Sequence, residues 1–336
     1  MSHPLPLVLA VDAGNSKTHV AVCDASGRLV GSAIGPGGSP QTLGLTAAVD
    51  QVGRLARQAC GQDRGFAVAA FAMAGLDLPE EEAAFHDAAI ASGLTGDAVV
   101  CNDTLALLRS GTVGDGVAVV AGAGTNCLGI KGGQEVRFHA LGRLTGDWGG
   151  GNDIGADALG IACRAEDGRG PGTSLARVVP AHFGLVRPLE LAEAVHLGRV
   201  PQERLVELSV PVFRAADEGD ALAMGLVRRM ADEVAAYVRA CVTRLGCGLA
   251  DLPVVLGGGI LRAGNIALMD AIGDALRELS PDVDIVVPSD PPIAGALRLA
   301  LAELPGDEAP LDLQLSRQLA VFSAGPTASA LTVSAG

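Results

Sequence analysis

The stretch LAVDAGNSKTHVAVCD, residues 9–24, decides the fold expected for this chain. Apolar residues run into Asp12, a short turn containing Gly14 and Lys17 follows, and a second apolar run begins after the turn. Such a turn between two strands exposes backbone N–H groups, and small residues let a phosphate approach them. The stretch therefore predicts a strand–turn–strand unit with an anion-binding turn, and Asp12 is placed to hold hydrated Mg²⁺.

The same pattern recurs further along the chain. Residues 117–140, VAVVAGAGTNCLGIKGGQEVRFHA, again read as strand, small-residue turn, strand, turn and strand. Gly124 takes the place of Gly14, 110 residues later, and the second turn offers Gly122 and the Thr125 hydroxyl without a lysine. A repeated unit predicts two similar lobes whose turns are able to face each other.

The remaining segments alternate between strand and helix patterns, which indicates an α/β fold. Strands are expected at residues 8–11, 19–23, 30–34 and 66–75 and within 97–111, 251–265 and 283–304. Helices are expected at residues 45–60, 79–92 and 217–245, after the loop 144–155, and near residue 304. We expect an N-terminal lobe over residues 1–112 and a C-terminal lobe over 113–304, with the last helix packing back on the first lobe. The tail, 305–336, allows no structural prediction.

Composition narrows the classes of function. A net charge of −14 argues against nucleic acid or an anionic membrane as the main partner, and favours a small molecule. The chain has no apolar run of about 18 residues and no basic segment before its first apolar run, so we expect neither a membrane helix nor a signal peptide. Seven scattered cysteines then suggest reduced thiols in the cytoplasm. The oligomeric state is left open, a homodimer included.

Asp103 is the strongest candidate for a catalytic group. It follows the apolar run AVVC and begins a helix pattern in CNDTLALL. One interpretation is a helix cap, a common role of Asp. The other is a general base that takes the proton from a substrate hydroxyl as this attacks a phosphate. We favour the second, because the preceding Asn102 is able to supply the cap.

Five motifs together resemble a known superfamily. The segments DAGNSKT, CNDTLALL, AGAGTNCLGI, LTGDWGGGNDIG and VVLGGGI, in this order, are similar to those of the sugar kinase, actin and Hsp70 superfamily. Within it they look like the N-acetylglucosamine kinase branch, the BadF/BadG-type ATPase family, over nearly the whole chain to about residue 304. The resemblance implies two similar lobes with a cleft between them. Each would be a mixed sheet with an antiparallel meander and flanking helices, the actin-like, ribonuclease H-like fold.

The resemblance also implies an activity and a set of residues. The activity would be ATP- and Mg²⁺-dependent phosphorylation of an amino sugar, N-acetylglucosamine at its 6-hydroxyl, with Asp103 as the catalytic base and Asp12 at the metal. The residues expected at ATP are Gly14, Asn15, Ser16, Lys17, Thr18, Gly122, Gly124 and Thr125 at the phosphates, and Gly257, Gly258 and Gly259 under the adenosine. Those expected at the sugar are Ser39, Asn102, Asn126, Asp147 and Trp148.

Two positions depart from the family pattern. Trp148 stands in GDWGGG where relatives commonly have a glutamate, and Ser39 stands where many have an asparagine that touches the sugar. Trp148, the only tryptophan, is interpreted either as a hydrophobic plug between the lobes or as an apolar face for sugar carbons. Because both departures fall in the sugar site, the sequence does not fix which sugar is used.

Other classes fit less well. GAGTNCLG opens a strand rather than a helix, which excludes a Rossmann dinucleotide site, and the chain lacks a P-loop motif. Cys241 and Cys247 fit core packing better than zinc binding. Two alternatives stay open: an ATPase that activates a 2-hydroxyacyl-CoA dehydratase through an iron–sulfur cluster, for which Cys127 and Cys163 are weak candidates, and a non-catalytic sugar sensor.

Overall fold

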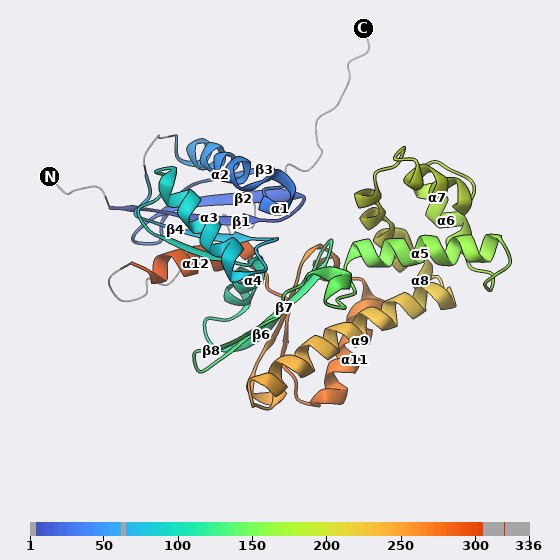
Figure 1. The fold of residues 1–336 in the computed structure, drawn as a ribbon. Coiled ribbons are helices and arrows are strands. Elements are labelled where there is room, and N and C mark those ends of the chain that lie inside the picture. Colours follow the sequence, from blue (N-terminus) through green and yellow to red (C-terminus); the bar gives the residue numbers. More distant parts are fainter. Residues whose placement is uncertain (1–4, 62–64, 305–318, 320–336) are drawn as a thin grey trace, which may run out of the picture. The chain divides into compact units, whose positions relative to one another are not determined.

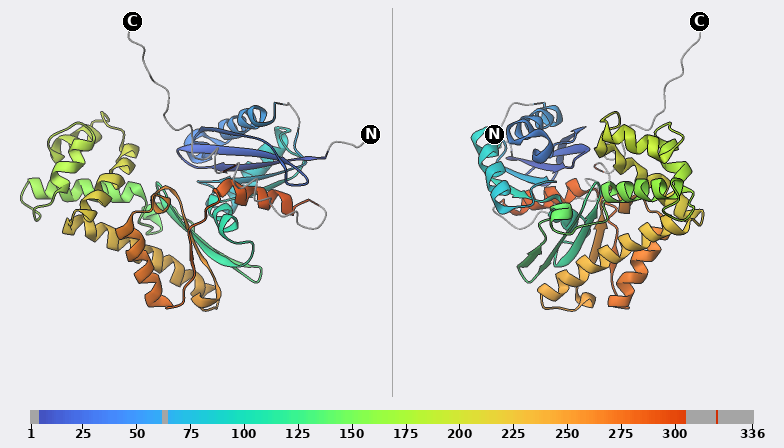
Figure 2. Two further views of the ribbon diagram at one scale, coloured as in Figure 1. Left: turned by 180° about the vertical axis from the view of Figure 1, so that it is seen from behind. Right: turned by 45° about the vertical axis from the view of Figure 1, so that its right-hand side comes forward.

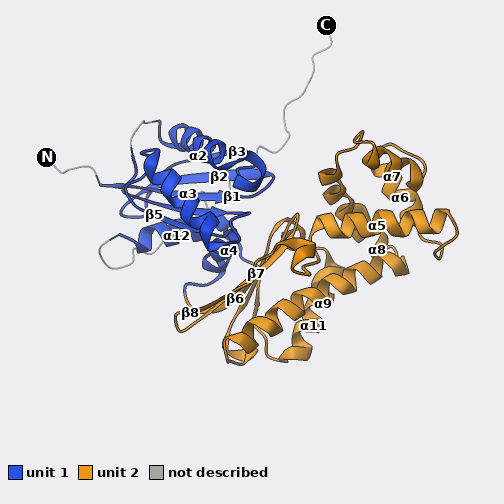
Figure 3. Ribbon diagram, viewed as in Figure 1, with its two compact units in different colours: residues 1–113, 288–336 blue, residues 114–287 orange. Residues whose placement is uncertain are grey.

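The computed structural model describes residues 5–61, 65–304 and 319, and the chain divides into two compact units (Figure 3). Unit 1 comprises residues 1–113 and 288–336, and unit 2 comprises residues 114–287. The expected second lobe ran to residue 304, whereas the chain returns to unit 1 at residue 288. The tail from residue 305 lies outside the described residues, apart from Leu319.

Unit 1 is built on a five-stranded mixed sheet in the order β3-β2-β1-β4-β5. The first three strands form the predicted antiparallel meander, and β4 and β5 continue the sheet parallel to β1. The strands are β1 (Leu7–Ala13), β2 (Lys17–Asp24), β3 (Leu29–Pro36), β4 (Val68–Met73) and β5 (Ala98–Cys101). The carboxyl ends of β1, β4 and β5 therefore meet at one edge of the sheet.

Helices cover both faces of this sheet (Figure 1). Leu9 and Val11 of β1 pack towards α2 and α3, while Val8 and Ala10 pack towards α12, because successive side chains alternate across a strand. The helices of the unit are α1 (Pro40–Leu43), α2 (Leu45–Cys60), α3 (Pro79–Ala91), α4 (Asp103–Gly111) and α12 (Pro292–Ala302). A Cβ on Gly295 of α12 would overlap the carbonyl oxygen of Ala106, so α12 lies directly against α4.

Unit 2 repeats the same sheet topology. Its order, β10-β9-β6-β7-β8, matches that of unit 1 when β6 is placed on β1. The strands are β6 (Gly116–Ala121), β7 (Thr125–Lys131), β8 (Gln134–Arg137), β9 (Val254–Gly257) and β10 (Ile285–Val286). The two mixed five-stranded sheets with flanking helices confirm the fold class and the internal repeat predicted from the sequence.

The helices of unit 2 form two groups (Figures 1 and 2). Helices α5 to α8 pack on one another, while α9 runs from this group to the sheet, beside α11. The α-helices are α5 (Gly151–Glu166), α6 (Leu175–His182), α7 (Pro188–His196), α8 (Ser209–Asp217), α9 (Ala221–Arg244), α10 (Gly259–Arg262) and α11 (Ile266–Leu279). Short 3₁₀ turns cover Gly142–Leu144, Gln202–Leu208 and Leu249–Asp251.

The long helix predicted over residues 217–245 begins later than predicted. The helix expected over residues 217–245 is interrupted, because α8 ends at Asp217 and α9 begins at Ala221. Gly219 has a positive φ of 91°, which ends a helix, and the Asp220 side chain accepts hydrogen bonds from the backbone N–H groups of Leu222 and Ala223. The break sets the direction in which α9 leaves the helical group.

Candidate active site

The first predicted phosphate turn lies between β1 and β2. Its hairpin closes through a 2.9 Å hydrogen bond from the Gly14 N–H to the Lys17 carbonyl oxygen, and Asn15, Ser16 and Lys17 are exposed. Thr18 is different, because it is fully buried and its hydroxyl accepts a 3.4 Å hydrogen bond from the Gln51 amide. The turn therefore presents residues 14–17 to solvent, while Thr18 is held inside unit 1.

The second predicted phosphate turn, between β6 and β7, is anchored to α5. Its carbonyl oxygens at Gly122 and Ala123 accept hydrogen bonds from Gly151 N (2.9 Å) and Asn152 N (3.0 Å), the first backbone donors of that helix. A Cβ on Gly122 or Gly124 would meet nothing within 4 Å. The turn thus supplies acceptors for the first two backbone N–H groups of α5. The open space beside Gly122 and Gly124 leaves room for a ligand.

The Gly149–Gly151 run is required by close packing. A Cβ on Gly150 would overlap the carbonyl oxygen of Ala123, and one on Gly151 would lie 2.6 Å from the Val206 side chain. These glycines bring the backbone of residues 149–151 against the second predicted phosphate turn and residue 206. Their role here is to permit contact between two segments.

The third glycine cluster lies beside the same turn. Gly258 has a φ of +88°, and a Cβ there would overlap the backbone of Ala121, the residue before the second turn. Gly257 ends β9, and Gly259 faces open space at the start of α10. Unit 2 therefore brings the second predicted phosphate turn and the glycines predicted under the adenosine next to each other.

Two buried hydroxyls lack hydrogen-bond partners among the described residues. They are Ser39 Oγ, in a fully buried residue, and Thr125 Oγ1, in a residue that is 8 % exposed. Buried polar atoms nearly always form hydrogen bonds, so each of these two hydroxyls needs an explanation. Both residues were predicted from the sequence to contact a ligand, and a ligand oxygen or N–H would satisfy them.

Asp103 begins α4 at the carboxyl edge of the unit 1 sheet, close to two further carboxylates. Burial, followed by the negative charges of Asp12 and Asp77, raises the pKa of Asp103 from 3.8 to about 7. A base with a pKa near the working pH is the most effective proton acceptor. Three elements thus place three acids where β1, β4 and β5 end.

The helix cap is supplied by the residue before Asp103, as the sequence predicted. Asn102 Oδ1 accepts hydrogen bonds from Thr104 N (3.1 Å) and Thr104 Oγ1 (2.5 Å). Its Nδ2 donates to Asp77 Oδ1 at 2.9 Å. Because the cap is already made, the Asp103 side chain is not needed for it, while Asn102, predicted at the sugar, is 4 % exposed and engaged within unit 1.

Asp77 was missed by the sequence analysis. Besides Asn102, its Oδ2 accepts a long, 3.4 Å hydrogen bond from Gln41 Nε2, and its backbone N–H donates to Glu81 Oε2 at 2.9 Å. The available signal was its position two residues after the buried segment FAMAG, just as Asp103 stands two residues after its strand AVVC.

His19 is a second residue that the sequence analysis passed over. It pairs directly with Asp12 across β1 and β2, is 2 % exposed, and its Nε2 lies 2.7 Å from Ser32 Oγ. Burial and the charge of Lys17 lower its pKa from 6.5 to about 4. The imidazole beside the predicted metal ligand is therefore neutral at physiological pH.

Asp147, predicted at the sugar, is held by two hydroxyls. Tyr237 of α9 donates to Asp147 Oδ1 at 2.5 Å, and Thr145 donates to Oδ2 at 2.5 Å. Tyr237 is 7 % exposed, and its ring packs edge-on against Phe138 with centroids 5.1 Å apart. Sequence reasoning did not find Tyr237, because it lies 90 residues from its partner. Asn126, also predicted at the sugar, is partly exposed on β7 beside the second turn.

Trp148 is part of the core of unit 2. It is 5 % exposed, its Nε1 donates to Asp157 Oδ2 at 3.0 Å, and the Arg229 guanidinium lies 4.0 Å from its ring centroid. Arg229 also donates to Asp157 Oδ2 at 3.0 Å. These contacts assign the indole to packing within unit 2, where its ring is covered, so the structure does not present it as an apolar face for a sugar.

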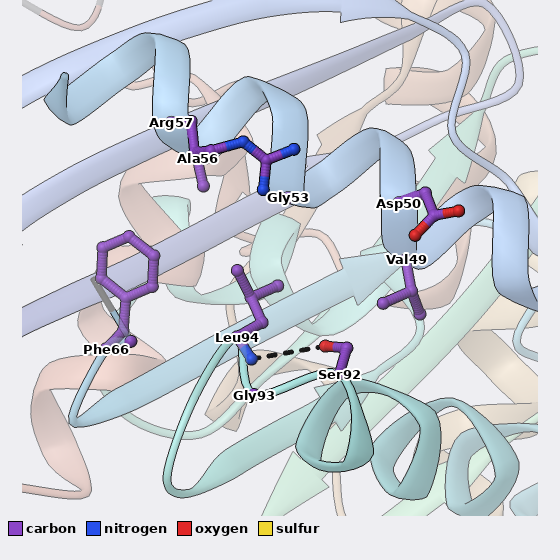
Figure 4. A pocket seen from close by; sticks show the side chains of 10 residues that line it. Val49, Asp50, Gly53, Ala56, Arg57, Phe66, Ser92, Gly93 and Leu94 are labelled. Atoms are coloured by element: carbon purple, nitrogen blue, oxygen red, sulfur yellow. Dashed lines mark hydrogen bonds between the residues drawn. The ribbon is translucent and has the colours of Figure 1, made fainter. Parts of the chain in front are cut away.

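One hollow of unit 1 lies away from the predicted site residues. It has a volume of about 180 Å³ and lies among α2, the end of α3 and the residues before β4 (Figure 4). Phe66 and Leu94, in its wall, precede β4 and β5, so the hollow is at the amino ends of the strands. Ligands of open α/β sheets bind at the opposite, carboxyl ends, where Asp103 lies. The hollow is therefore a poor candidate for the site.

Within residues 5–61, 65–304 and 319, three or more His, Cys, Asp or Glu side chains nowhere gather as a metal-binding group. Cys127 and Cys163, weak candidates for an iron–sulfur cluster, are both buried free thiols. Across the same described ranges, every helix is too short or too polar to span a membrane.

Comparisons with known proteins agree with this architecture. The chain is 24 % identical to an N-acetyl-D-glucosamine kinase of Dictyostelium discoideum over 314 residues, covering 88 % of this chain and 98 % of the relative. It is also 24 % identical to an N-acetylmuramic acid/N-acetylglucosamine kinase of Clostridium acetobutylicum over 306 residues, with the same coverage.

A solved structure shares the fold. A protein of Chromobacterium violaceum, provisionally named an N-acetylglucosamine kinase, matches with a TM-score of 0.69 and 22 % identity, over 88 % of this chain and 99 % of that one. A family model matches residues 9–300 and confirms the resemblance seen in the sequence motifs. The chain belongs to the BadF/BadG/BcrA/BcrD ATPase family.

Proposed function

We propose that this protein is an ATP-dependent kinase of an amino sugar, with N-acetylglucosamine phosphorylated at its 6-hydroxyl. The observation that carries the proposal is the position of Asp103, which begins α4 at the carboxyl edge of the unit 1 sheet and is not needed for the helix cap, because Asn102 makes it. Transfer of a phosphoryl group to a sugar hydroxyl needs a carboxylate that accepts the hydroxyl proton. The names of the two relatives at 24 % identity support an amino sugar as the acceptor.

The residues around the turns fit ATP. The unpartnered Thr125 hydroxyl and the open faces of Gly122 and Gly124 suit phosphate oxygens, and the exposed Lys17 ammonium supplies a positive charge. Asp12 is the residue that would hold Mg²⁺, which would neutralise phosphate charge. His19, neutral beside Asp12, adds no competing positive charge.

Three side chains are proposed to bind the sugar. Ser39 offers an unpartnered hydroxyl, Asn126 a partly exposed amide, and Asp147 a carboxylate fixed by Tyr237. In the reaction, the 6-hydroxyl gives its proton to Asp103 as its oxygen attacks the γ-phosphorus and the bond to the β-phosphate oxygen breaks, releasing ADP. Because the reaction consumes ATP, we also place the protein in the cytoplasm.

A substrate panel tests this proposal. ADP release is measured with hexoses, N-acetylhexosamines and their derivatives, each with ATP and Mg²⁺, and the product of the best substrate is mapped by NMR. We expect the fastest release with N-acetylglucosamine and a new phosphate on its 6-oxygen. ADP release that no sugar stimulates would contradict the proposal and would favour an ATPase that acts on a protein partner.

A further inference from the structure

A hollow of about 170 Å³ opens beside Asp147, and all of its lining residues belong to unit 2. Its wall combines apolar groups, one hydroxyl and two carboxylates, contributed mainly by Phe138, Asp147, Glu233, Ala236, Tyr237 and Ala240. Four of these residues lie on α9, where positions three and four apart share a face. One helix face therefore shapes the space next to Asp147, the carboxylate that is proposed to bind the sugar.

The Asp147 carboxylate is fixed in this wall. Tyr237 uses its only proton to donate to Asp147 Oδ1, and its ring is held by the edge-on contact with Phe138. The tyrosine hydroxyl is therefore not a donor for a second anion in the hollow. Each carboxylate oxygen of Asp147 still has accepting capacity for a sugar hydroxyl or amide.

Glu233 adds a second carboxylate one helical turn before Tyr237. Its side chain is partly buried, and burial together with the charges of Asp232 and Asp147 raises its pKa, against the opposing effect of Arg229. Arg229 itself is bound to Asp157 and stacked on Trp148. None of the described residues that line the hollow is basic, and the Arg244 guanidinium, 5.1 Å from the centroid of the Phe138 ring, is not itself part of the wall.

We infer that this hollow selects uncharged amino sugars over amino sugars that carry a carboxylate, and that Glu233 is the residue that sets this specificity. The inference rests on the proposed function, in which Asp147 holds the sugar. An acetyl methyl group or a ring carbon would pack against Phe138, Ala236 and Ala240. A substrate carboxylate would instead meet two like charges in a partly desolvated space, where repulsion is stronger than in water.

N-Acetylmuramic acid tests this distinction, because it is N-acetylglucosamine with a carboxylate-bearing lactyl ether. We expect kcat/KM of the wild-type protein to be at least about tenfold higher for N-acetylglucosamine. Glu233→Gln, which keeps the size of the side chain and removes the charge, should reduce this ratio by about tenfold or abolish the preference. The matched control is Asp270→Asn, which removes one charge from an exposed position of α11 and should leave the ratio unchanged.

The outcomes separate this inference from the proposed function. Turnover of N-acetylglucosamine with an unchanged ratio in Glu233→Gln, or equal use of both sugars by the wild type, would overturn the inference and leave the kinase function standing. Failure to phosphorylate either sugar would overturn both. If Glu233→Gln does not fold, the wild-type ratio measured at low salt and at about 0.5 M salt decides, because screening should narrow an electrostatic preference and leave a steric one intact.

Discussion

At the scale of single residues, the site depends on which groups are kept charged and which are kept neutral. Asp103 has its pKa raised to about 7 by burial and by two neighbouring acids, while burial and Lys17 keep His19 neutral with a pKa of about 4. Three acids at one sheet edge are unfavourable for folding unless a cation or a proton compensates them. This arrangement is more readily explained by chemistry than by stability.

The Asp103→Asn variant should separate a catalytic role of Asp103 from a role in stability. We expect kcat to fall about 10²–10⁴-fold, because the amide cannot accept the proton, while ATP still binds. In the wild type, kcat/KM, which follows the pKa of the free enzyme, should fall as the pH is lowered through about 7, since only the carboxylate is active. Stopped assays of both proteins across roughly pH 5.5–9, which brackets this pKa, would measure the loss of activity in the variant and the pH dependence of the wild type.

Stability supplies the control for that variant. Because folding raises the pKa of Asp103 above 3.8, its contribution to stability is greatest below that pH and is lost as the pH rises through about 7. The asparagine variant should therefore melt at an equal or higher temperature than the wild type at pH 8. Near-normal activity, or a marked loss of stability at pH 8, would show that Asp103 is a structural residue.

At the scale of elements, the decisive contact is that between α5 and the second turn. The first two backbone donors of α5 bind the carbonyl oxygens of Gly122 and Ala123, and Gly150 permits this approach because it lacks a side chain. The Asp147 loop and the proposed phosphate site are thus parts of one hydrogen-bonded segment. A change that moves α5 away should disturb both.

Gly150→Ala tests this contact. The added methyl overlaps the Ala123 carbonyl oxygen, so we expect a loss of about 1–3 kcal/mol in unfolding free energy and weaker ATP binding. The matched control is Gly160→Ala within α5, where a Cβ meets nothing within 4 Å and should stabilise the helix by about 0.5–1 kcal/mol. Calorimetric melting and nucleotide titration would measure both, and equal behaviour of the two variants would exclude the packing role.

At the scale of the whole molecule, each unit has its own hydrophobic core. The core of unit 2 lies under α5 to α9 and contains Trp148 and Tyr237, the only tryptophan and tyrosine of the chain. The two cores of unit 1 lie on opposite faces of its sheet. Units with separate cores commonly unfold in separate steps.

We therefore expect denaturant unfolding without ligand to show two transitions. Tryptophan fluorescence follows unit 2 alone, since Trp148 is buried there, whereas far-ultraviolet circular dichroism follows the helices of both units. The midpoints of the two signals should differ in urea. Superimposable curves would instead mean that the two units unfold as one cooperative body.

The sequence predicted those features that neighbouring residues determine. The two hairpin turns, and the cap supplied by Asn102, involve partners a few residues apart, so their patterns are visible in the chain. Asp77 and Tyr237 were missed because they meet Asn102 and Asp147 across 25 and 90 residues. The Gly149–Gly151 run illustrates a third case, since glycines required by close packing and glycines that confer mobility look identical in a sequence.

The return of α12 to unit 1 has a consequence for synthesis on the ribosome. Unit 2 is a continuous segment, residues 114–287, and is complete in the nascent chain before α12 has been made. Until then the face of β1 that carries Val8 and Ala10 lacks the helix that covers it. Unit 1, although translated first, therefore has to wait for α12, and its apolar sheet face is a natural place for a chaperone to bind during that interval.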